Sequence, residues 1–154
     1  MEATNQNLVN LDVDSYNNLS MEQLKRGVLQ IKEHSVISNN PLGCILTNYK
    51  YDKRPQVKID NKKYYCSVIM KLYAEKIKYG EDYNIKPGFD CSHFYCHNQE
   101  CVETDHLHFE NHLVNKSRLC CRIYGIYKYD QVTKYICPHF PKCYICDYNS
   151  IKLN

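Results

Sequence analysis

The chain has 154 residues, with ten cysteines, 15 tyrosines, no tryptophan and a formal net charge of +3. A chain of this length is most simply one domain with a modest hydrophobic core. No apolar run approaches the ~18–20 residues of a membrane span, and the N-terminal stretch lacks the basic and apolar blocks of a secretory signal. These exclusions favour a reducing compartment, where clustered cysteine and histidine indicate metal sites. Disulfides are the alternative, which applies if a secretory signal has been removed.

The N-terminal segment is polar and rich in asparagine. We therefore expect residues 1–19 to be loosely ordered and residues 20–154 to form a single domain. Ser20 and Gln23 match the S-x-x-Q pattern of a helix capping box. Apolar residues then recur at spacings of three and four, which predicts an amphipathic helix over residues 21–34. The Ser-Asn-Asn-Pro sequence at 38–41 begins a loop.

Residues 43–66 mix basic, aromatic and β-branched side chains, which predicts short strands. The segments QVKI and KKYYC flank a tight turn at Asp60-Asn61, and GCILTNYKY predicts a further strand. Residues 48–63 hold six basic and two acidic side chains, whereas residues 1–24 hold four acidic and no basic ones. An antiparallel ribbon of this kind fits the major groove of DNA. The alternative is a solvated, lysine-rich strand face. The candidate DNA contacts are Lys50, Lys53, Arg54, Gln56, Lys58, Lys62 and Lys63.

Residues 67–79 place Ile69, Leu72, Tyr73 and Ile77 on one face, which predicts a second helix that stops at Gly80. Strands and helices in this order indicate a small α+β domain, and we find no internal repeat.

Residues 91–121 contain five cysteines and five histidines. One triad has the pattern C-x4-C-x4-H and consists of Cys96, Cys101 and His106. Another has the pattern C-x-H-x3-C and consists of Cys137, His139 and Cys143. Structural zinc takes four ligands, so each triad needs one more. The candidates for the first site are Cys44, Cys66 and Cys91, and those for the second are Cys120 and Cys121. Two closed sites would also stabilise a fold whose core is small.

These patterns resemble those of the His-Cys box homing endonucleases, DNA-cutting enzymes of the ββα-metal (His-Me finger) superfamily. The resemblance rests on Ser-His at 92–93, HLHFE at 106–110, NKSR at 115–118 and the two zinc patterns. It covers residues 91–143 well and residues 43–80 loosely. It implies a zinc-stapled domain with an antiparallel sheet for DNA contact, a ββα-metal nuclease core and two structural zinc ions.

The resemblance also implies roles for individual residues. His93 matches the general base, and Asn115 matches the residue that binds one catalytic Mg²⁺. Lys63 lies in the stretch where the family usually has an arginine near the cleaved phosphate. The first zinc site would consist of Cys44, Cys96, Cys101 and His106. The second would consist of Cys121, Cys137, His139 and Cys143, with Cys120 or Cys146 as substitutes that the spacing leaves open.

The chain departs from the family pattern at three points. Cys96 follows His93 by three positions, one more than the family leads us to expect, so His97 is a second candidate for the base. Lysine offers charge without the bidentate fork of arginine, which implies reduced activity. The dimerising tail of the family is short here, since only DYNSIKLN follows Cys146.

Three hypotheses follow. The first is a sequence-specific DNA endonuclease that hydrolyses phosphodiester bonds, acts as a homodimer on double-stranded DNA and, by the family's habit, resides in the nucleus. The second is a zinc-stabilised DNA-binding protein without cleavage activity. The third is a zinc-ribbon-like protein-interaction module, which would show no salt-dependent affinity for duplex DNA.

Overall fold

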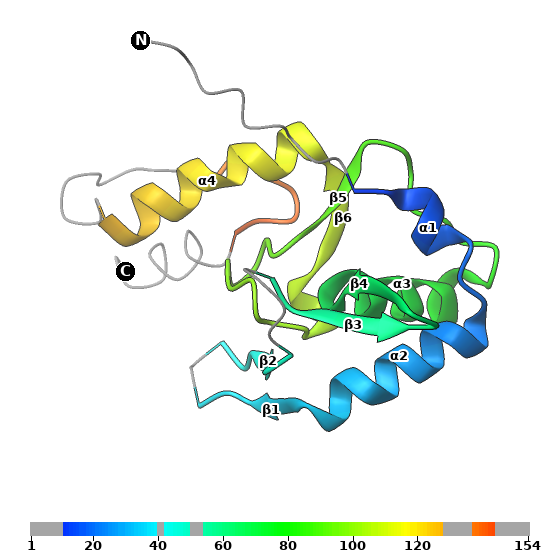
Figure 1. Cartoon of the computed structure of the whole chain (residues 1–154). Coiled ribbons are helices and arrows are strands. Elements are labelled where there is room, and N and C mark those ends of the chain that lie inside the picture. Colours follow the sequence, from blue (N-terminus) through cyan, green and yellow to red (C-terminus); the bar gives the residue numbers. More distant parts are fainter. Residues whose placement is uncertain (1–10, 40–41, 50–53, 128–136, 144–154) are drawn as a thin grey trace, which may run out of the picture.

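The computed structural model describes residues 11–39, 42–49, 54–127 and 137–143. Its strands form three separate antiparallel pairs, β1 with β2, β3 with β4 and β5 with β6, and helices pack around them (Figure 1). The elements in chain order are α1 (Val13–Asn17), α2 (Met21–Glu33), β1 (Ser35–Ile37), β2 (Ile45–Thr47), β3 (Gln56–Ile59), β4 (Lys62–Tyr65), α3 (Cys66–Tyr79), β5 (Phe89–Ser92), the 3-10 turn η1 (Thr104–His106), β6 (His108–Asn111) and α4 (His112–Tyr127). This is the small α+β fold that the sequence predicts.

The N-terminal part of the described chain is more ordered than its composition suggests. We expected residues 1–19 to be loosely ordered, but α1 forms within them, and Val13 and Tyr16 are buried in the core. The Tyr16 hydroxyl accepts a hydrogen bond of 2.9 Å from the backbone N–H of Tyr65, and its ring meets Tyr64 edge to face. A buried tyrosine with a satisfied hydroxyl anchors a segment that is otherwise polar. Residues 1–10 lie outside the described residues, and the domain boundary at residue 20 stays a prediction.

Helix α2 begins at the predicted capping box. The Ser20 hydroxyl accepts from the N–H of Gln23, and the Gln23 side chain accepts from the N–H of Ser20. The helix buries Leu24, Val28 and Ile31 against α3 and β3. At Gly27, helix α2 comes so close to β3 that an added Cβ would lie 2.7 Å from a methyl carbon of Ile59.

The β3–β4 hairpin turns at Asp60 and Asn61, both of which have positive φ angles. This is the two-residue turn whose twist matches that of paired strands. Val57 and Ile59 face the core, while Lys58 stands opposite Lys63 on the exposed face. Within the described part of the expected strand GCILTNYKY, residues 43–49, only Ile45–Thr47 form a strand, which pairs with β1 and not with the β3–β4 hairpin.

The C-terminal half of the described chain is built on β5, β6 and α4. The two strands pair from Phe89 with Asn111 to Ser92 with His108, and α4 begins directly after β6. The long loop between them, residues 93–107, holds most of the first cysteine and histidine cluster. In Figure 1, α4 begins at one end of this strand pair. Side chains of its first turn contact Asp90 of β5. The helices described are too short or too polar to span a lipid bilayer.

Candidate active site and metal centres

The first metal cluster joins the residue just before β2 to the loop between β5 and β6. It consists of Cys44, Cys96, Cys101 and His106, whose ligand atoms all lie within 4.8 Å of one another. The Nδ1 atom of His106 is 3.4 Å from the Sγ atom of Cys101 and 3.7 Å from that of Cys44. Zinc bond lengths of ~2.3 Å to sulfur and ~2.0–2.1 Å to nitrogen give tetrahedron edges of about 3.5–3.8 Å. The donor set therefore fits a closed structural zinc site.

Backbone pairing brings Cys44 to this cluster. Leu46 of β2 forms a bridge with Cys101, and the N–H of Val102 donates to the carbonyl of Ile45 at 2.8 Å. The residue just before β2 is thereby placed beside the loop. Cys66, a competing candidate from the sequence, instead opens α3 and is buried in the hydrophobic core.

The second cluster consists of Cys121, Cys137, His139 and Cys143. The Sγ atoms of Cys121 and Cys137 are 3.6 Å apart, and the Nδ1 atom of His139 lies 3.3 and 3.4 Å from them. These distances also fit a closed tetrahedral zinc site. The structure thus brings together both predicted sets of four. The Cys120 side chain and Cys146 lie outside the described part.

A buried ion pair connects the second cluster to the strands. Arg118 of α4 donates from Nε and Nη2 to the two carboxylate oxygens of Glu110, at 2.6 and 2.7 Å. Its Nη1 also donates to the Pro141 carbonyl and to the Cys143 sulfur. The side chains of Arg118 and Glu110 are 2% and 6% exposed. A planar guanidinium can make all these bonds at once, so it fixes α4, β6 and the zinc-ligand loop together.

Replacing Arg118 by methionine is expected to lower the free energy of unfolding by about 3–5 kcal/mol, because the Glu110 carboxylate is left buried without its partner. The matched control is Arg26→Met, which breaks the exposed pair between Arg26 and Asp60 and should change stability by at most about 1 kcal/mol. Urea unfolding of the zinc-loaded proteins measures both changes. Equal effects of the two substitutions would contradict a structural role for the buried pair.

A cleft of about 680 Å³ lies between the β3–β4 hairpin, β5 and α4. His93 and Asn115, the two predicted catalytic residues, both line it, although 22 positions separate them in the sequence. His93 follows β5 directly, and Asn115 lies in the first turn of α4. The pairing of β5 with β6 and the immediate start of α4 bring them together.

His93 is half-buried and held in one tautomer. Its Nε2 atom lies 3.1 Å from the carbonyl oxygen of Cys101. A carbonyl can only accept, so Nε2 carries the proton and Nδ1 carries the lone pair. Burial, and to a smaller extent the charge of Arg54, lowers the pKa of His93 to about 4 against the opposing effect of that hydrogen bond. The imidazole is therefore neutral at pH 7 and able to accept a proton.

The extra residue between His93 and Cys96 is absorbed locally. Residues 94–96 form a turn, the backbone N–H of His97 donates to the His93 carbonyl at 2.9 Å, and His97 has a positive φ of 52°. The longer spacing therefore leaves His93 bonded to the loop that holds zinc ligands. His97, the second candidate for the base, also lines the cleft.

Asn115 shares a carboxylate with a histidine. Its Nδ2 atom donates to Oδ2 of Asp90 on β5 at 3.3 Å, and Nδ1 of His112 contacts the same oxygen. The Asn115 amide oxygen is therefore not used in these bonds. Oxygen atoms are the ligands that Mg²⁺ prefers, so the donor set suits a hard divalent cation. Sequence reasoning missed Asp90 and His112, because no spacing pattern links them to Asn115.

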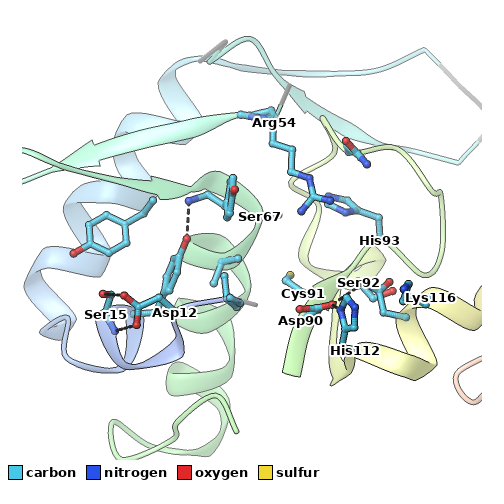
Figure 2. A pocket seen from close by; sticks show the side chains of 18 of the residues that line it. Asp12, Ser15, Arg54, Ser67, Asp90, Cys91, Ser92, His93, His112 and Lys116 are labelled. Carbon is cyan, nitrogen blue, oxygen red and sulfur yellow. Dashed lines mark hydrogen bonds and ion pairs between the residues drawn. The ribbon is translucent and has the colours of Figure 1, made fainter. Parts of the chain in front are cut away.

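The positive side chains around the cleft differ in part from those expected. Figure 2 shows the Arg54 guanidinium beside the His93 ring, so an arginine does approach the predicted base. Lys63 lines the cleft as predicted, and Lys116 of α4 lines it as well. Lys62 donates to Ser15 on the inner side of the hairpin. Gln56 and Lys58 lie on the ribbon, while Lys50 and Lys53 lie outside the described residues.

Comparison with known proteins agrees with this arrangement. A family model described as the zinc-binding loop region of homing endonuclease matches residues 30–154. The chain belongs to this family. The homing-endonuclease match begins within α2 and includes both zinc clusters and the cleft residues His93 and Asn115. Membership indicates a nuclease domain of the His-Me finger type, with DNA as the substrate that the family implies. No curated protein and no solved structure shows significant similarity to the chain.

Proposed function

We propose that the protein is a sequence-specific, homing-type DNA endonuclease that hydrolyses phosphodiester bonds and acts as a homodimer. The observation that carries the proposal is the meeting of His93 and Asn115 in one cleft that Arg54, Lys63 and Lys116 make positive. A base, a cation ligand and phosphate-binding side chains are the parts that phosphodiester hydrolysis needs.

His93 acts as the general base. Its Nδ1 atom takes a proton from the water that attacks phosphorus, while the bond from Nε2 to the Cys101 carbonyl holds the ring and stabilises the charge that it gains. The first zinc site acts through this bond, because its ligand Cys101 carries the accepting carbonyl. The zinc ions are structural, and no proton or phosphate moves through them.

Asn115 would hold the catalytic cation through its amide oxygen, which its hydrogen bond to Asp90 does not use. A bound Mg²⁺ supplies Lewis acidity that stabilises negative charge on the departing 3′ oxygen. Arg54, beside His93, provides a fork that can bind two oxygens of the cleaved phosphate, which lysine cannot do. We therefore assign to Arg54 the phosphate contact that the sequence suggested for Lys63. Lys63 and Lys116 bind neighbouring phosphates.

The β3–β4 hairpin supplies electrostatic affinity for the DNA backbone. Lys58 and Lys63 stand directly opposite each other on its exposed face, so this face carries concentrated positive charge. Replacing either lysine by glutamine should lower the slope of log affinity against log salt by about 1. Lys25→Gln, on the exposed side of α2, should leave the slope unchanged. Equal slopes for all variants, measured by fluorescence anisotropy, would argue against this binding face.

Cleavage of a randomised duplex library tests the proposed function. Wild type with Mg²⁺ should give discrete cuts at one sequence, and Asn115→Ala should bind the selected duplex without cutting it. EDTA should also stop cleavage, with circular dichroism and zinc content checked because EDTA can remove structural zinc. Salt-dependent binding without cuts by folded, zinc-loaded wild type would favour the alternative, a DNA-binding protein that has lost cleavage.

A further inference from the structure

Asp90 lies in the cleft in a position that the chemistry above does not use. The carboxylate comes from β5, three residues before His93, and its side chain is 19% exposed. Its Oδ2 atom accepts a hydrogen bond of 3.3 Å from Nδ2 of Asn115 and also contacts Nδ1 of His112. Figure 2 shows Asp90 and His112 close together on the same side of the cleft as His93. Both contacts end on Oδ2, so Oδ1 can still accept a bond from a ligand in the cleft.

We propose that Asp90 is the positioning residue of the divalent-cation site, and that it also supplies the negative charge this site needs. The inference rests on the proposed function, because it assumes that Asn115 binds a cation. Asp90 fixes which end of the Asn115 amide faces the cleft, and Oδ1 accepts a hydrogen bond from water bound to the cation.

The orientation follows from the chemistry of the two groups. The oxygen and the NH₂ of an amide are nearly equal in size, so packing alone does not decide which one faces the cation. An ionised carboxylate only accepts hydrogen bonds, so the NH₂ of Asn115 must face Asp90. The carbonyl oxygen of Asn115 then faces away from Asp90, where it can bind the cation. Without Asp90 the amide could turn over and present two N–H groups instead.

The need for a negative charge at Asp90 follows from the small number of protein ligands that the cation would have. A single neutral amide oxygen is a weak ligand for Mg²⁺, which proteins usually hold with one or two carboxylates together with substrate phosphates. Positive side chains line this cleft, among them Arg54, Lys62, Lys63 and Lys116. These suit phosphate but repel a cation, and Asp90 is the carboxylate that offsets them next to Asn115.

His112 anchors the carboxylate. It begins α4, and Asn115 follows it by three residues, so both side chains lie on one face of the first helical turn. Both therefore reach Asp90 across the β5–α4 packing, and the carboxylate is held from two points. Among the described residues, the other ring nitrogen of His112, Nε2, is buried without a hydrogen-bond partner, so the contact with Asp90 is the one polar bond that fixes this ring.

The test is cation binding without DNA, using Mn²⁺ as the probe. The full chain carrying two zinc ions is titrated with Mn²⁺, and the electron paramagnetic resonance signal of unbound Mn²⁺ gives the affinity. Asp90→Asn keeps the shape and removes the charge. It should weaken binding about 10- to 100-fold, the range seen when groups that support metal ligands are removed. Asp82→Asn removes an exposed carboxylate outside the cleft and should change nothing. Zinc content should stay at two ions in both variants.

Separate outcomes distinguish this inference from the proposed function. Loss of Mn²⁺ binding in Asn115→Ala together with wild-type binding in Asp90→Asn would overturn the role of Asp90 and leave the endonuclease proposal in place. Equal binding by wild type and Asn115→Ala would overturn the cation site, and this inference with it. Should Asp90→Asn fail to fold, nuclear magnetic resonance on wild type decides. Mg²⁺ should shift the Asp90 carboxyl carbon and the Asn115 side-chain nitrogen, and an unmoved Asp90 signal would overturn the inference.

Discussion

Replacing His93 by alanine is expected to slow DNA cleavage by about 10²–10⁴-fold, the usual contribution of a general base. DNA affinity should change little, because Arg54, Lys63 and Lys116, the cleft residues proposed to bind phosphate, remain. Single-turnover rates on the duplex selected from the library measure the effect, and anisotropy measures the affinity. The substitution also leaves the Cys101 carbonyl without a donor, but that carbonyl belongs to a loop that the zinc ligands hold in place.

The matched control is His34→Ala. His34 lies at the end of α2, its ring packs against Tyr49 at an interplanar angle of 40°, and it does not line the cleft. Cleavage by this variant should equal that of wild type. Cleavage that survives in His93→Ala and falls in His97→Ala would show that the base is His97, which also lines the cleft.

Replacing Cys101 by serine is expected to remove one zinc ion and to unfold the loop between β5 and β6. Structural zinc in small domains contributes apparent binding free energies of about 10–16 kcal/mol at neutral pH, a large part of which is folding free energy. Cys101 is fully buried, its Sγ atom lies 3.4 Å from Nδ1 of His106, and its backbone pairs with Leu46 of β2. Its replacement therefore disturbs both the zinc cluster and the carbonyl that holds the His93 ring. Zinc content should fall from two ions to one, the melting temperature should fall sharply, and cleavage should stop.

Cys66→Ala is the control for this substitution. Cys66 is as fully buried as Cys101 but packs in the hydrophobic core, outside both clusters. The Cys66→Ala variant should keep both zinc ions, and its melting temperature should fall only by the effect of a smaller buried side chain. If Cys101→Ser retained two zinc ions and the wild-type melting temperature, the first cluster would not be a zinc site.

The elements that the sequence predicted well are those with a strong local pattern. Helix α2 forms over Met21–Glu33 behind its capping box, and α3 over Cys66–Tyr79, each within a residue of the expected limits. The triad Cys96, Cys101 and His106 and the triad Cys137, His139 and Cys143 follow from spacing, because ligands close in sequence need little from the rest of the fold. The choice of Cys44 over Cys66 came from the family resemblance and agrees with the pairing of β2 to the zinc-ligand loop.

Other features depend on tertiary contacts and could not be predicted. Strand β1 has no alternation of its own and forms only because β2 pairs with it. Arg54 looked like one of several basic residues for the DNA backbone, and the structure turns it toward His93. The roles of Asp90 and Arg118 depend on hydrogen bonds to Asn115 and Glu110, which lie 25 and 8 positions away in the sequence. A single sequence does not indicate which carboxylate or guanidinium will be buried beside which partner.

In the proposed mechanism, His93 and Asn115, from separate elements, act on one phosphate across the cleft. The most direct test is a double-mutant cycle of single-turnover cleavage rates for wild type, His93→Ala, Asn115→Ala and the double variant. Residues that act as a unit are strongly non-additive, so the double variant should be about as slow as the slower single variant. Wild-type cleavage by either folded single variant would contradict this mechanism.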